Sequence, residues 1–174
     1  MNLRAGALDA AIELMYFAYR GFVGEADRVL ALRGLARAHH RVLFFVARLK
    51  RPTVGELRRT LSVSKQSLAG PLRELKRQDL IAWHADPGDA RVRRLALTPS
   101  GRALERRLSV LQRRAFRAVF AQAGPRDEAG WRAVMHRLAR DELLRSGREL
   151  DLEGVAPPGG GTGTRPVRRP ARAC

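Results

Sequence analysis

Residues 53–97 read TVGELRRTLSVSKQSLAGPLRELKRQDLIAWHADPGDARVRRLAL, and the rest of the predicted fold is arranged around them. Thr53 followed by Glu56 is a capping-box pattern, which predicts a short helix directly after Thr53. Ser64 is a second N-cap candidate, and the leucines behind it recur at steps of three and four, so a second helix follows closely. Two helices joined by a tight turn are typical of proteins whose second helix enters the major groove of DNA.

Two short strands follow, at residues 80–84 and 92–97. Between them residues 86–91 read DPGDAR, a run of turn-forming residues, so the segment predicts a two-stranded hairpin. Arginines on the tip and the return strand suit the DNA backbone or the minor groove beside a recognition helix. We therefore expect a winged helix-turn-helix within a mainly α fold that has one small β-hairpin wing.

The order of TVGEL, SKQSL, RELKRQDLI, DPGDAR and LTPSGRAL resembles the MarR family of bacterial transcriptional regulators. Asp89 and Arg91 match the Asp-x-Arg of that family's wing, and residues 97–101 match the Leu-Thr-Pro-x-Gly that opens its next helix. The resemblance implies that Arg91 enters the minor groove while Asp89 holds it in place. It also implies a homodimer formed through the terminal helices, a small aromatic or anionic effector, and repression rather than activation.

Positive charge is the dominant feature of the composition. The 174 residues carry a formal net charge of +17, of which residues 151–174 account for only +2. Such a field favours an anionic partner, here double-stranded DNA. The lone cysteine, Cys174, leaves no disulfide to form within the chain, and no run of about 18 apolar residues predicts a membrane span. We expect a cytoplasmic protein.

The rest of the chain is predicted to be helical. Apolar residues at helical spacing predict a long helix over 8–32, closed by Gly34, and a central core helix from about Arg37 to the residues before Pro52. The expected organisation is one domain over 1–150, with dimerisation arms at 8–32 and 126–147, the winged helix-turn-helix at 37–97, a linking helix at 98–122 that Thr98 and Pro99 begin, and a disordered Gly/Pro/Arg tail at 151–174.

Side chains for DNA contact gather in the second helix and the wing. Gln can pair with adenine and Lys can donate to guanine at the N-terminal turn, whereas cations further along suit phosphates or are simply solvated. Arg93 and Arg94 alternate faces on the return strand, so at most one of them should point at DNA. The predicted DNA-binding residues are Ser64, Lys65, Gln66, Ser67, Arg73, Lys76, Asp89, Arg91, Arg93 and Arg94.

Pro71 lies inside the predicted recognition helix. A proline there removes one backbone hydrogen bond and costs roughly 3 kcal/mol if nothing compensates. Because the leucine spacing continues across it, we expect the helix to continue, either kinked near Ser67 or with a bond that was already weak.

The candidates for an effector site are Tyr16, Tyr19, His39 and His40, although aromatics at helical spacing more often belong to a core. The two histidines do not predict a metal site, because neighbours on a helix point about 100° apart. We expect no cofactor.

Two other classes of function deserve comparison. An enzyme is not expected, since no Gly-x-Ser-x-Gly, phosphate loop or His-Glu-x-x-His is present. A nonspecific basic nucleic-acid-binding protein fits the charge equally well. It would bind with steep salt dependence and no sequence preference, whereas a regulator should prefer an inverted repeat.

Overall fold

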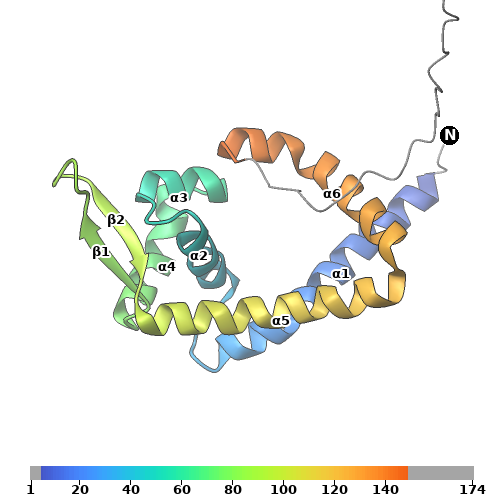
Figure 1. Cartoon of the computed structure of the whole chain (residues 1–174), viewed down its shortest axis with the longest axis horizontal. Coiled ribbons are helices and arrows are strands. Elements are labelled where there is room, and N and C mark those ends of the chain that lie inside the picture. Colours follow the sequence, from blue (N-terminus) through green and yellow to red (C-terminus); the bar gives the residue numbers. More distant parts are fainter. Residues whose placement is uncertain (1–4, 149–174) are drawn as a thin grey trace, which may run out of the picture.

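The computed structural model describes residues 5–148, so the predicted tail at 151–174 and Cys174 lie outside the described residues. Six helices and one antiparallel hairpin make up this part of the chain (Figure 1), which confirms the predicted fold class. In chain order the elements are α1 (Ala5–Ala31), α2 (Arg37–Arg48), α3 (Val54–Leu61), α4 (Lys65–Arg77), β1 (Ile81–Ala85), β2 (Arg93–Leu97), α5 (Pro99–Ala123) and α6 (Pro125–Ser146).

Local signals set most of the helix ends. Gly34 adopts a left-handed φ of 66°, which lets Leu35 N–H reach back to the Leu30 carbonyl at 3.0 Å and close α1. The reciprocal bonds between Thr53 and Glu56 begin α3, as predicted. α2 begins at Arg37 without a Ser, Thr, Asp or Asn cap.

Helix α4 runs from Lys65 to Arg77 through Pro71, so the predicted continuation is confirmed. The residue before a proline is normally driven out of the helical region by a clash that involves its own Cβ atom. Here that residue is Gly70, which has no Cβ, so one part of the penalty is absent.

One hydrophobic core joins the winged helix-turn-helix to α5. It is formed by the end of α1, α2, the leucines of α3 and α4, both strands and the first turns of α5, with Leu30, Leu43, Leu57, Leu75, Leu80, Leu95 and Leu108 fully buried. The strands pair in register from Ile81 opposite Leu97 to Ala85 opposite Arg93.

The other half of the molecule is thinly packed. Helix α1 lies against α5, and α6 turns back from the end of α5 until its C-terminal end approaches α3 (Figure 1). An aromatic group, Phe22, Phe116, Phe120 and Trp131, connects α1, α5 and α6. The first half of α1 buries no residue, and its apolar side chains Leu8, Ile12, Leu14, Met15, Tyr16, Phe17 and Tyr19 are exposed.

Candidate nucleic-acid interface

The recognition helix α4 presents one basic and polar face to solvent. At 100° per residue, Lys65, Gln66, Arg73 and Lys76 fall within about 100° of one another, and all four are exposed. The adjacent face, centred about 100° away around the helix, carries Leu68, Leu72 and Leu75, which are buried. Burial of the leucine face therefore fixes the direction in which the basic face points.

Ser64 and Ser67, which were also predicted to contact DNA, cap the first turn of α4. Ser64 Oγ accepts the backbone N–H of Ser67 at 3.0 Å, and the two hydroxyl groups lie 2.8 Å apart. Both side chains are exposed, but they are already engaged in capping α4. Their local role is to hold the first turn, so Lys65 and Gln66 project from a fixed backbone.

The last turn of α4 is charged but internally paired. Glu74 accepts two hydrogen bonds from Arg77 and one from Gln78, and these bonds lower the pKa of Glu74 to about 2. Gln78 also donates to the Arg33 carbonyl at 3.0 Å, which connects α4 to the loop after α1. Arg73 and Lys76 form no ion pair among the described residues and are exposed, so both side chains are available to a binding partner.

The wing places Arg91 and Arg93 in solvent, at its tip and at the start of its return strand. Asp89 accepts the backbone N–H of Arg91 at 2.9 Å, so this carboxylate shapes the turn rather than holding the Arg91 guanidinium. The arginine that a wing carboxylate does hold is Arg94, which is paired with Asp86. Of the two arginines on the return strand, Arg93 is exposed and Arg94 is partly buried.

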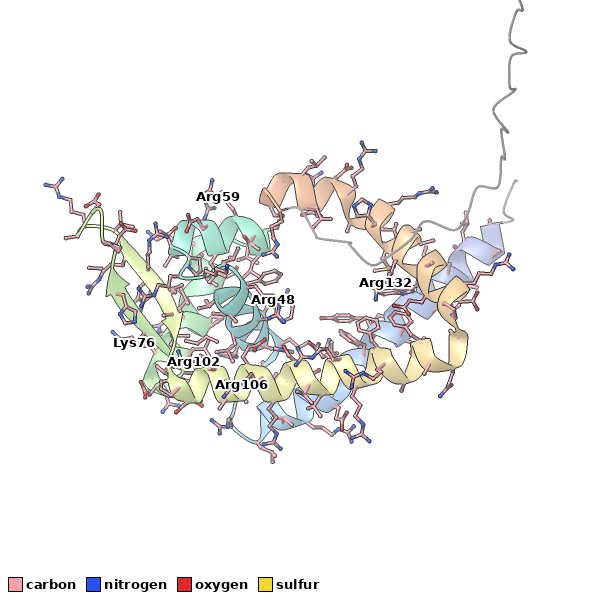
Figure 2. The ribbon with its side chains drawn as sticks, in the orientation of Figure 1. Arg48, Arg59, Lys76, Arg102, Arg106 and Arg132 are labelled. Atoms are coloured by element: carbon pink, nitrogen blue, oxygen red, sulfur yellow. The ribbon has the colours of Figure 1, made fainter. Side chains whose placement is uncertain are left out.

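Further cations surround these elements and were not singled out from the sequence. Figure 2 labels Arg102 and Arg106 on the N-terminal part of α5 and Arg59 on α3, besides Lys76 on α4. Arg102 and Arg106 are four residues apart on α5, a spacing that could have drawn attention to this helix face.

A cavity of about 450 Å³ lies between α1, α2 and α5. It receives two of the four predicted effector residues, Tyr19 and His40, whereas Tyr16 and His39 lie outside it. The side chain of His39 instead accepts the N–H of Ala36 at 2.9 Å and begins α2. The remaining lining is Phe22, Val23, Arg37, Arg41, Phe44, Phe45, Arg48, Ser109, Gln112, Arg113 and Phe116.

The cavity combines aromatic walls with positive charge. Arg48 on α2 donates to Glu105 on α5 at 2.8 Å and to the Phe44 carbonyl at 3.1 Å, so its side chain links the two helices. Burial alone would raise the pKa of Glu105, but hydrogen bonds from Arg48 and Ser109 bring it below its ordinary value. His40 is buried, its Nε2 has no hydrogen-bond partner within residues 5–148, and burial lowers its pKa.

Two features are absent from residues 5–148. No group of three His, Cys, Asp or Glu side chains there could hold a metal ion. No helix in the same range is long and apolar enough to cross a membrane.

Comparison with known proteins agrees with this geometry. A family model described as "MarR family" matches residues 33–92. The chain is 43% identical over 138 residues to the HTH-type transcriptional regulator PetP of Rhodobacter capsulatus, covering 79% of this chain and 83% of that protein.

Solved structures show the same fold. A transcriptional regulator of the MarR family from Silicibacter pomeroyi has a TM-score of 0.62 at 23% identity, with 75% of this chain and 88% of that chain covered. The S. aureus MepR–DNA complex has a TM-score of 0.60 at 17% identity, with 80% of this chain and 99% of that chain covered.

Proposed function

The chain belongs to the MarR family of DNA-binding transcriptional regulators, and from that premise we propose that it binds an inverted-repeat operator as a homodimer and represses transcription. Residues 37–97 are the DNA-binding unit, and the arms at 8–32 and 126–147 join two copies. The protein acts in the cytoplasm, where its operator lies. A two-fold axis would place two recognition helices about 34 to 36 Å apart, one turn of DNA.

The observation that carries this proposal is the exposed face of α4. Lys65 and Gln66 project from a capped first turn, and Arg73 and Lys76 continue the same face without an ion pair to any residue in 5–148. Gln and Lys at a helix N-terminus can read bases, and the later cations can hold phosphates. The apolar half of α1, which no other part of residues 5–148 covers, supports the dimer.

A selection of genomic DNA tests the operator. Purified protein would be equilibrated with fragments of its genome at about 150 mM salt, where nonspecific phosphate binding is already weakened. We expect an inverted repeat to be enriched, and we expect Gln66→Ala and Arg91→Ala to weaken binding to it. Arg117→Ala is the matched control, because it removes an exposed cation from the second half of α5, outside α4, the wing and both arms.

The alternative of a nonspecific nucleic-acid-binding protein has its own outcome in the same experiment. Such a protein would retain fragments without a common sequence, the two arginine variants would bind alike, and Gln66→Ala would bind as the native protein does. A reporter gene placed behind the enriched repeat then tests the direction of control, and higher expression in the presence of the protein would contradict repression.

A second part of the proposal is control by a small aromatic or anionic molecule in the cavity between α1, α2 and α5. The support is its volume of about 450 Å³, its phenylalanine walls and the four arginines around it. Such a mixture of apolar surface with a few fixed polar groups is typical of small-ligand sites.

Benzoate, the simplest aromatic anion, is a suitable probe for this cavity. At millimolar concentration we expect it to raise the melting temperature of the protein, because a ligand that binds only the folded state stabilises it. Arg41→Gln, at the cavity wall, should reduce that increase, whereas Arg28→Gln, outside the cavity, should not. An unchanged melting temperature with benzoate would contradict an anionic effector.

A further inference from the structure

Three segments of the winged helix-turn-helix meet at the guanidinium of Arg94. Its Nε donates to Asp86 in the wing turn, and its Nη1 donates to the Arg51 carbonyl at 3.1 Å. The same Nη1 lies 3.7 Å from Glu56, the residue that closes the capping box of α3. One side chain on β2 therefore connects the wing turn, the loop between α2 and α3, and the first turn of α3.

The loop between α2 and α3, which carries the Arg51 carbonyl, has an unusual backbone conformation. Lys50 and Arg51 both have left-handed φ angles, of 50° and 69°, which non-glycine residues rarely adopt. Their turn leads into Pro52, whose carbonyl accepts Leu95 N–H at 2.8 Å, and into Thr53, which forms an isolated bridge with Arg94. The loop thus lies along β2 through backbone contacts, and the Arg94 side chain adds a hydrogen bond to the Arg51 carbonyl.

The wing arginines divide into two kinds. Arg91 and Arg93 are exposed and form no ion pair among the described residues, whereas the Arg94 side chain is 32% exposed and has partners on two sides. The pairing is mutual, since the hydrogen bond from Arg94 lowers the pKa of Asp86 and the same bond raises the pKa of Arg94. A guanidinium so engaged would have to leave its partners before it could reach a phosphate.

We propose that Arg94 is a positioning residue that connects Asp86 of the wing to Glu56 and the Arg51 carbonyl, and so fixes the direction in which Arg91 meets DNA, without contacting DNA itself. This inference rests on the proposed function, because it requires that Arg91 contacts the operator.

A substitution at Asp86 tests the inference by the sign of its effect. Asp86→Asn removes a negative charge near DNA but leaves an oxygen for the backbone N–H groups of Gly88 and Asp89, which Asp86 Oδ1 now accepts. If Arg94 contacted DNA, freeing it in this way would strengthen binding. The positioning role predicts the opposite, a loss of about 5- to 20-fold in operator affinity, the range expected from coupling energies between contacting residues.

A double-mutant cycle tests whether Arg94 acts through Arg91. Operator affinity would be measured by fluorescence anisotropy at about 150 mM salt for Arg91→Ala, Arg94→Gln and the double variant. We expect Arg94→Gln to weaken binding in the native background and to have little further effect once Arg91 is removed. Arg93→Gln is the matched control of equal charge, and its effect should persist in the Arg91→Ala background.

The possible outcomes separate the two proposals. If Arg91→Ala alone leaves operator binding unchanged, the proposed contact of the wing with DNA is wrong. If Arg91→Ala weakens binding but the effect of Arg94→Gln is undiminished beside it, Arg94 contacts DNA or acts elsewhere, and the positioning role is wrong. A readout without DNA completes the test: hydrogen exchange at Leu95 N–H should become faster in Arg94→Gln and stay unchanged in Arg93→Gln.

Discussion

Gly101 lies where α5 leaves the wing, and the chain has no room there for a side chain. A Cβ atom at this position would lie 1.9 Å from the Leu80 carbonyl oxygen. We expect Gly101→Ala to destabilise the fold by about 1 to 3 kcal/mol or more, the usual effect of overpacking a core, as measured by urea unfolding. Gly55→Ala on α3, whose Cβ would meet only Thr53 Oγ1 at 3.8 Å, is the control and should be neutral or slightly stabilising. Equal stability of the two variants would contradict this close approach.

His40 gives the folded state a dependence on pH. Burial lowers its pKa below the ordinary value of 6.5, so the unfolded chain binds a proton at a higher pH than the folded protein does. Stability rises with pH wherever the unfolded state binds more protons, and the free energy of unfolding should therefore decrease as the pH falls below about 6.5. Glu105, whose pKa is also lowered, adds a separate loss only below its ordinary value of 4.5.

The measurement is urea unfolding between about pH 7 and pH 5, the interval around the ordinary histidine pKa. We expect the free energy of unfolding to decrease less over this interval in His40→Gln than in the native protein. His84→Gln, on the exposed face of the wing, is the control and should retain the full decrease. If the two variants had the same pH profile, the loss would have to come from another group.

The start of α5 depends on one hydroxyl group. Thr98 Oγ1 donates to the Asp79 carbonyl at 2.6 Å and accepts Gly101 N–H at 3.0 Å, so it both caps α5 and joins it to the end of α4. Thr98→Val keeps the shape but removes both bonds and should cost about 1 to 3 kcal/mol of unfolding free energy. Thr98→Ser keeps the hydroxyl and should lose less than half as much by the same urea measurement. A larger loss in the serine variant would show that the methyl group dominates.

The elements themselves were largely predictable, because their signals are local. The capping residues Thr53, Ser64 and Thr98 and the turn residue Gly34 set helix ends within a few residues of themselves, and the strands were placed within one residue. The start of α2 was harder to place, since its cap is the side chain of His39, which no common capping pattern includes.

The contacts between elements were not predictable in the same way. Arg94 and Asp86 are eight residues apart across a turn, and Arg48 and Glu105 are 57 residues apart. Many arginines in this chain could have paired with each acidic residue, and only the packed fold selects one. For this reason the sequence identified the exposed face of α4, but it could not separate the exposed Arg91 and Arg93 from the engaged Arg94.

At the scale of the described molecule, residues 5–148, the first half of α1 is an apolar surface that is left uncovered. Ile12 is 69% exposed, and a charge there should oppose association of two chains through this arm. We expect Ile12→Glu to sediment as a monomer at micromolar concentration, where the native protein sediments as a dimer, and to bind its operator at least about tenfold more weakly. Leu32→Glu introduces the same charge at an 85% exposed residue beyond the end of α1 and serves as the control. Identical sedimentation of the native protein and both variants would rule out dimerisation through this helix.

The exposed apolar face of α1 affects how the amount of active regulator depends on the number of chains in the cell. If the arm is covered only when two chains meet, the binding-competent species forms in proportion to the square of the chain concentration, as long as most chains are single. A twofold rise in synthesis would then give about a fourfold rise in that species. The amount of active regulator would thereby change more steeply than the number of chains per cell, because one copy leaves this face of α1 uncovered.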